Sequence, residues 1–271
     1  MVHPLHLVAP VCLTRPSIGA TGKRADVRAW DDLLGALSLL SRLPLPAHQA
    51  RGAAGAWAWP LAGVVLGAIA GGIGALTLGL GLAPGAAALL ALLAAVMLGG
   101  ALHEDGLADM ADGLWGGQTP ERRLEIMKDS RIGAFGVIAL VLSLGARWAA
   151  LSALFAASPW AGITAMVAAG TVSRAAMAGV MAALPPAREN GLSRAVGRPG
   201  ALGAGLAIAL ALLVLFGICG LSGISALIGA ALAVALTARL ALAKIGGQTG
   251  DVLGASQQMA EVAVLLVLMP G

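Results

Sequence analysis

The chain reads GAAGAWAWPLAGVVLGAIAGGIGALTLGLGLAPGAAALLALLAAVMLGGAL from Gly52 to Leu102, without a single Asp, Glu, Lys or Arg. Residues 199–238 are equally free of these four residue types. A helix needs about 20 apolar residues to cross a hydrocarbon core of ~30 Å, so continuous apolar runs of this length are typical of bundled transmembrane helices. The strands of an outer-membrane barrel would alternate apolar and polar residues instead. The two runs therefore predict an all-α, polytopic membrane protein.

The composition of the whole chain excludes two other classes of protein. Of its 271 residues, 59% are hydrophobic and 11% are charged, whereas an average soluble domain is about 25% charged. So few charges cannot cover the surface of a soluble domain of this length, and so high a hydrophobicity excludes a disordered chain. The formal net charge of +4 is interpreted as a topology signal, and we expect no nucleic-acid partner.

Six apolar segments, with a weaker seventh at the C-terminal end, are predicted to cross the membrane. Gly63, Gly67 and Gly71 repeat every four residues on one face of the first segment, which predicts close packing against a neighbouring helix. The predicted spans are residues 60–82, 86–102, 134–157, 160–183, 201–221, 223–243 and 252–269.

The part of the chain before the first span divides into two segments. Residues 1–28 are predicted to be a mobile cytosolic extension, which leaves residues 29–271 as a single integral-membrane catalytic domain. From Trp30 to Leu43, apolar residues recur at helical spacing while Asp31 and Asp32 take the other side. This pattern predicts an amphipathic helix that lies in the membrane interface. Tryptophans at span starts are predicted to be interfacial aromatics, namely Trp57, Trp59 and Trp160.

The distribution of Lys and Arg predicts the orientation of the spans. Threading the chain from a cytosolic N-terminus places every basic loop on the cytosolic side, and the turns on the opposite side carry no charge. The predicted cytosolic loops are residues 44–56, 103–133, 184–200 and 244–251, and the opposite turns are residues 83–85, 158–159 and about 222.

Seven of the 13 acidic residues lie between positions 104 and 129. At 100° per residue, Asp105, Asp109 and Asp112 fall within about 60° of one another on a helix face, and Glu104 flanks them. Carboxylates this close raise each other's pKa unless they share a cation. Oxygen ligands without cysteine suit Mg²⁺ or Mn²⁺ rather than zinc. We therefore predict a magnesium site formed by these four residues; the alternative is a solvated acidic helix start.

Further polar residues complete the predicted site. If a helix starts at Asp251, it shares one face with Gln258 and Glu261, within about 80°, and we add Asp251 to the metal ligands. Glu261 is either functional or paired with a buried arginine, Arg147 or Arg174. Arg188 either contacts the substrate or is solvated. The residues predicted to neutralise a substrate phosphate are Lys128, Arg131, Arg174 and Lys244.

Residues 104–113, EDGLADMADG, and 121–133, ERRLEIMKDSRIG, closely resemble the cobalamin synthases, which are integral membrane enzymes of vitamin B12 assembly. Three further elements resemble the same family in the same order and extend the resemblance over all but the first 28 residues. They are SRLPLP at 41–46, with Ser where the family has Thr, Trp59-Pro60 with Gly63 and Gly67, and GGQTGD at 246–251.

The resemblance implies an adenosylcobinamide-GDP ribazoletransferase in a bacterial inner membrane. In this reaction α-ribazole, or its 5′-phosphate, attacks adenosylcobinamide-GDP. The products are GMP and adenosylcobalamin, or adenosylcobalamin 5′-phosphate, and the reaction requires Mg²⁺. Displacement at a diphosphate needs charge neutralisation and alignment more than covalent help. Our hypothesis is that Asp105, Asp109 and Asp112 are catalytic and, with Glu104, hold one or two Mg²⁺ ions.

Two rival functions are weighed against this one. A CDP-alcohol phosphotransferase shares the opening at residues 105–108, but Asp109 stands where that family has Arg, and the later Gly-x₃-Asp-x₃-Asp half is missing. A secondary transporter would use the intramembrane Arg147, Arg174 and Glu261. Against it, the polar groups gather on one side and the sequence shows no inverted repeat.

Overall fold

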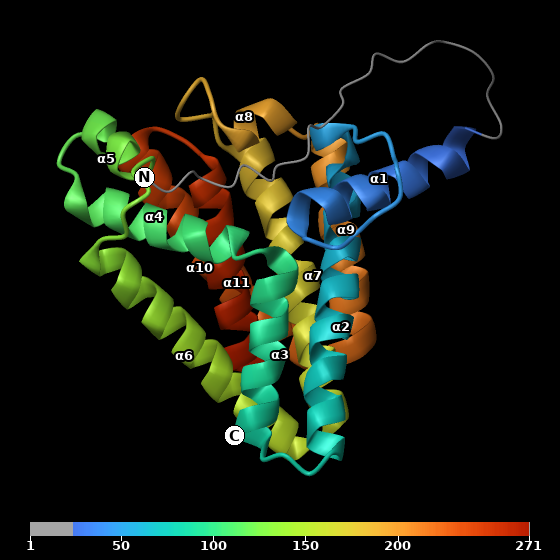
Figure 1. The fold of residues 1–271 in the computed structure, drawn as a ribbon. Helices are drawn as coiled ribbons and strands as arrows, with labels where there is room; N and C mark the ends of the chain where they lie inside the picture. The colour runs from blue at the N-terminus through green and yellow to red at the C-terminus, as the bar shows by residue number, and fades with distance from the viewer. Residues whose placement is uncertain (1–23, 271) are drawn as a thin grey trace.

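The computed structural model describes residues 24–270, and every regular element in that range is helical (Figure 1). The predicted all-α class is confirmed. The predicted extension lies outside the described residues up to position 23, and its last five residues belong to the first helix. The elements in chain order are α1 Arg24–Leu40, the 3-10 helix η1 Gly52–Ala58, α2 Trp59–Gly79, α3 Pro84–Gly99, α4 Leu102–Gly116, α5 Pro120–Ile126, α6 Ala134–Ala157, α7 Pro159–Ala183, α8 Leu192–Val196, α9 Ala201–Cys219, α10 Ser222–Ile245 and α11 Gly250–Leu268.

Six helical segments of the described chain are long and apolar enough to cross a membrane. They are Gly52–Gly79, which joins η1 to α2, and the helices α6, α7, α9, α10 and α11. Large apolar side chains on these segments point outward: Leu76, Leu142 and Leu213 are 64%, 67% and 71% exposed, as expected of residues that face lipid. The predicted multi-pass bundle is therefore confirmed.

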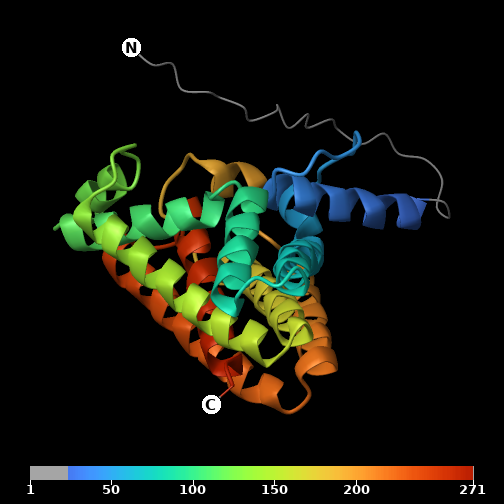
Figure 2. The ribbon, with the colours of Figure 1, turned by 60° about the horizontal axis from the view of Figure 1, so that its bottom comes forward.

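Helices α3 and α4 pass the same test only as a pair, which would make a seventh span, but they meet at an angle of 86°. The turn is made by Gly100 and Ala101, which are both left-handed with φ of 63° and 55°. Glycine adopts this conformation freely, whereas the alanine is strained. As a result α4 runs across the end of the bundle (Figures 1 and 2). It is not among the six segments that pass the test on their own, and it carries its acidic residues at this end of the bundle.

The glycine stripe of α2 packs against the backbone of α7, as the sequence predicted. A Cβ atom on Gly67 would lie 2.5 Å from the carbonyl oxygen of Met166, and one on Gly71 would lie 2.8 Å from the Cα of Ile163. A Cβ on Gly63 would collide with the carbonyl group of Gly170. Any side chain at these positions would push the two helices apart.

We therefore expect Gly63→Ala to lower the free energy of unfolding by about 1–3 kcal/mol or more, the usual effect of an overpacked contact. The matched control is Gly72→Ala on the same helix, where a Cβ meets nothing within 4 Å and alanine favours the helix. Thermal unfolding in detergent compares the two. Equal melting temperatures would show that α2 and α7 can separate freely at this point.

Helix α1 buries Leu34, Leu37 and Leu40, and its exposed side includes Trp30, so the predicted amphipathic helix is present. The prediction for Asp32 was wrong, because its carboxylate is buried and accepts bonds from Arg51 Nε at 2.7 Å and Trp57 Nε1 at 2.8 Å.

Trp59 does not stand in the membrane interface as predicted. It is 2% exposed and belongs to the hydrophobic core, whereas Trp160 is 73% exposed. The first span begins earlier than its apolar pattern suggested, with η1 at Gly52, so Trp59 falls inside the bundle.

The loops predicted to share one side gather at one end of the bundle, with α1, α4, α5 and α8, and the turn between α2 and α3 lies at the other end (Figure 1). Hydrogen bonds connect these loops. Gln248 donates its backbone N–H to the Pro185 carbonyl at 2.8 Å and accepts from Ala187 at 2.9 Å. Arg123 donates to the Lys244 carbonyl at 3.1 Å. The acidic helix α4 and the start of α11 therefore belong to one polar end.

Candidate active site

Helices α4 and α11 touch backbone to backbone through two glycines. A Cβ on Gly106 would lie 3.0 Å from the carbonyl oxygen of Asp251 and 3.2 Å from the Cα of Gly254. A Cβ on Gly254 would in turn lie 3.2 Å from the Cα of His103. This contact brings the acidic face of α4 next to the first turn of α11.

Three aspartates from these helices form what we call the aspartate cluster: Asp105, Asp109 and Asp251. Asp105 is exposed and Asp109 is half-buried, and neither accepts a hydrogen bond or joins an ion pair within residues 24–270. Asp251 is held by Arg188 NH2 at 2.7 Å and by the Thr249 hydroxyl at 3.1 Å. Two carboxylates are thus open to a ligand, beside a third that is anchored.

The pKa of Asp109 is raised to about 7, first by burial and then by the negative charges of Asp105, Asp251 and Asp112, while Arg188 opposes the shift. Like charges that are partly removed from water disfavour the ionised form. A bound cation would remove this repulsion. Among the four acids of α4 that were predicted to bind a cation, Asp109 is the one whose pKa is raised in this way.

Asp112 has a different role in the structure. Its Oδ2 accepts the backbone N–H of Gly133 at 2.7 Å, and its Oδ1 accepts that of Gly136 at 2.8 Å. Both groups belong to the start of α6, where backbone N–H groups have no partner within the helix. Asp112 thus caps α6 from a neighbouring helix. A Cβ on either glycine would collide with this carboxylate, which explains the glycines at these two positions.

Glu104 is not brought together with the aspartates. Its carboxylate is buried and accepts bonds from Arg147 NH2 at 3.0 Å and Gln258 Nε2 at 3.1 Å. Glu104 precedes Asp105 directly, so the two side chains point about 100° apart around α4.

None of the predicted phosphate-binding cations pairs with the aspartate cluster. Lys128 and Arg131 are exposed, and Arg131 pairs with Asp129 at 2.6 Å. Lys244 is half-buried. Arg174 is buried and donates to the Gly170 carbonyl at 3.0 Å and to Glu261 at 3.4 Å.

The cation at the cluster is Arg188, whose role the sequence left open. It pairs with Asp251, and its NH1 is buried without a partner in the described part of the chain. Sequence reasoning missed Thr249, although a Thr two residues before Asp251 is typical of a helix N-cap. Its hydroxyl accepts the N–H of Val252 at 3.3 Å.

The donor set of the cluster suits one kind of metal. No three His, Cys, Asp or Glu side chains among residues 24–270 converge closely enough to form a ready-made metal site. Mg²⁺ is usually bound through one or two carboxylates together with substrate phosphates, rather than in an all-protein cage. The open carboxylates of Asp105 and Asp109 therefore fit a hard divalent cation that is completed by a phosphorylated substrate.

Comparison with known proteins agrees with this chemistry. The family model of cobalamin-5-phosphate synthase matches residues 32–269. The chain belongs to this family. The adenosylcobinamide-GDP ribazoletransferase of Bradyrhizobium diazoefficiens is 46% identical over 241 residues, which cover 87% of this chain and 92% of that protein. The enzyme of the same name from Mesorhizobium japonicum is 47% identical over 245 residues, 88% of this chain and 92% of that protein. No solved structure matches the chain.

Proposed function

We propose that this protein is an adenosylcobinamide-GDP ribazoletransferase. It would transfer the cobinamide-phosphate moiety of adenosylcobinamide-GDP to α-ribazole, or to α-ribazole 5′-phosphate, and release GMP. The relatives of this name, matched over most of their length, support the reaction. The observation in the structure that carries the proposal is the pair of open carboxylates, Asp105 and Asp109, beside Asp251 and Arg188.

In the proposed mechanism, Asp105 and Asp109 would hold Mg²⁺. When bound, this ion supplies neutralisation of the negative charge on the diphosphate oxygens. Arg188 keeps one amino group on Asp251 and donates the other to a diphosphate oxygen. An aspartate of the cluster accepts the proton of the attacking ribazole hydroxyl. The ribazole oxygen forms a bond to the phosphorus that carries cobinamide, the bond from this phosphorus to the bridging oxygen breaks, and GMP leaves with that oxygen without a dedicated general acid.

The proposed location is a bacterial inner membrane, with the aspartate cluster on the cytosolic side. Basic residues support this orientation, because they are concentrated in the loops at the same end as the cluster, whereas the opposite turns carry none. A cytosolic site would meet a soluble nucleotide-activated substrate directly.

The direct test uses the purified protein in lipid nanodiscs with adenosylcobinamide-GDP and α-ribazole. We expect GMP and adenosylcobalamin to form in equal amounts, and both to disappear when EDTA removes Mg²⁺. Chromatography with mass spectrometry measures the two products. Formation of phospholipid from a CDP-activated precursor, with no use of adenosylcobinamide-GDP, would instead show the rival phosphotransferase. Substrate uptake into proteoliposomes without GMP release would show a transporter.

A further inference from the structure

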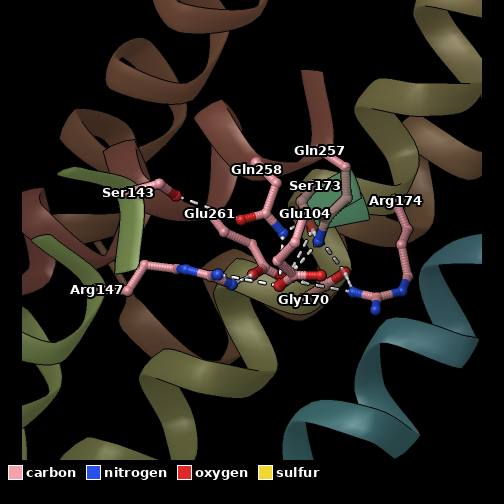
Figure 3. A network of polar contacts seen from close by, with 9 residues as sticks. All are labelled: Glu104, Ser143, Arg147, Gly170, Ser173, Arg174, Gln257, Gln258 and Glu261. Atoms are coloured by element: carbon pink, nitrogen blue, oxygen red, sulfur yellow. Dashed lines mark hydrogen bonds and ion pairs between the residues drawn. The ribbon is translucent and has the colours of Figure 1, made fainter. Parts of the chain in front are cut away.

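A buried charge network connects four of the helices (Figure 3) and has no part in the mechanism above. We use this name for Glu104 of α4, Arg147 of α6, Arg174 of α7 and Glu261 of α11. Arg147 is 2% exposed and bridges two acids: its NH2 lies 3.0 Å from Glu104, and its NH1 lies 3.1 Å from Glu261. Arg174 reaches Glu261 from the other side at 3.4 Å. Two positive and two negative groups cancel, so the network has no net attraction for a phosphate.

Amide side chains of α11 complete the network. Gln258 donates to Glu104 at 3.1 Å, and Gln257 donates to Glu261 at 2.5 Å. Charges taken out of water are tolerated only when they are paired and hydrogen-bonded in this way. The pairing that the sequence left open for Glu261 is thus made with both Arg147 and Arg174.

A cavity of about 40 Å³ adjoins the network and is lined by all four of its members. Three residues that line it have a buried nitrogen without a partner within the described residues: Nε of Arg147, Nε of Arg174 and Nε2 of His103. A polar cavity of this size holds on the order of three water molecules, which would satisfy these atoms.

Arg147 connects the two helices that carry the aspartate cluster. On α4, Glu104 lies roughly 100° from Asp105 and roughly 140° from Asp109, so its attachment to Arg147 turns these aspartates away from the bundle interior. On α11, Glu261 lies in the third turn after Asp251. One guanidinium on α6 thus fixes the rotation of α4 and the position of α11 together.

We propose that Arg147 is a positioning residue: by bridging Glu104 and Glu261, it holds Asp105 and Asp109 opposite Asp251. This inference rests on the proposed function only in taking the aspartate cluster as the cation site. It also distinguishes two roles for Glu104, as an anchor for α4 or as a metal ligand. An anchor acts only through Arg147, whereas a ligand acts independently of it.

The test measures the affinity of the protein for Mn²⁺ by electron paramagnetic resonance, at a fixed concentration of inorganic pyrophosphate that takes the place of the substrate diphosphate. The variants are Glu104→Gln, Arg147→Gln and the double variant, each checked for folding by thermal unfolding. We expect each single change to weaken Mn²⁺ binding by roughly ten- to a hundredfold, the usual effect of removing a group that orients metal ligands. The double variant should bind no more weakly than the weaker single variant, because both changes break the same bridge.

The control is Ser143→Ala, one helical turn before Arg147 on α6, which removes only a 3.4 Å contact with Gln258 and should bind Mn²⁺ like the wild type. If the losses of Mn²⁺ affinity in the two single variants multiply in the double variant, Glu104 acts as a ligand and the proposal is overturned. Wild-type Mn²⁺ affinity in Arg147→Gln would overturn it as well.

If Arg147→Gln does not fold, Arg147→Lys takes its place. An ammonium group lacks the planar fork that reaches two carboxylates at once, so a severalfold weaker affinity is expected and wild-type affinity would refute the bridge. Failure of the proposed function looks different: the wild type would bind Mn²⁺ and show the same dependence on Arg147, yet release no GMP.

Discussion

Asp109→Asn should reduce GMP release by roughly a thousandfold, equivalent to about 4 kcal/mol of lost transition-state stabilisation. In the proposed mechanism the open carboxylate of Asp109 is one of two that would hold Mg²⁺, and metal ions supply several kcal/mol of charge stabilisation at a phosphoryl group. Asparagine keeps the shape of the side chain but neither its charge nor its capacity to accept a proton. Single-turnover GMP release at saturating Mg²⁺ measures the loss.

The same variant should unfold at an equal or higher temperature than the wild type. Asp109 makes no hydrogen bond in the described structure, and it lies among the negative charges of Asp105, Asp251 and Asp112. Removing its charge relieves repulsion, a trade of stability for function that is common at active sites. Glu121→Gln on the exposed helix α5 is the matched acid-to-amide control and should retain full turnover. Full turnover in Asp109→Asn would remove this residue from the cation site while leaving the family assignment intact.

Arg188→Gln should change two kinetic constants in opposite directions. The KM for adenosylcobinamide-GDP should rise by about ten- to a hundredfold, because a charge-assisted hydrogen bond contributes about 1.5–3 kcal/mol. The Mg²⁺ concentration needed for half-maximal rate should fall, because Asp251 loses its positive partner at 2.7 Å and the cluster becomes more negative. Steady-state assays that vary each component in turn measure both values.

The control for this prediction is Arg194→Gln, an exposed arginine of the short helix α8 in the same loop region. It should leave both constants unchanged, since it has no contact with the aspartate cluster. A KM that stays at the wild-type value in Arg188→Gln would show that the buried NH1 does not meet the diphosphate. A rise in both constants would show instead that Arg188 supports the cation site through Asp251.

Much of the architecture could be predicted because it depends on local pattern. Apolar runs predicted spans that correspond to η1–α2, α6, α7, α9, α10 and α11, whereas the run at 86–102 corresponds to α3, which passes as a span only together with α4. The spacing of Gly63, Gly67 and Gly71 predicted a close helix contact, since residues four apart share a helix face. The same spacing of four residues predicted that Asp105 and Asp109 share one face of a helix. Both residues do lie in the helix α4.

The role of each acid could not be predicted in this way. A helical projection places Glu104 and Asp112 near the aspartates, but it does not show which neighbouring helix covers each of them. Glu104 meets Arg147, and Asp112 meets the start of α6. Both partners follow from the 86° bend at Gly100–Ala101, which turns α4 across the bundle. Nothing in the apolar pattern indicated this bend.

The sequence by itself determined a multi-pass helical protein with an acidic segment at one polar end, because the membrane imposes span length and apolar composition on each helix separately. Only the tertiary structure decided which carboxylates remain open. That choice depends on contacts between helices distant in sequence, such as Gly106 with Gly254 and Arg188 with Asp251. A buried charge pairs with the partner that packing brings within reach, so Glu104 and Asp112 are hydrogen-bonded within the protein, while Asp105 and Asp109 stay open.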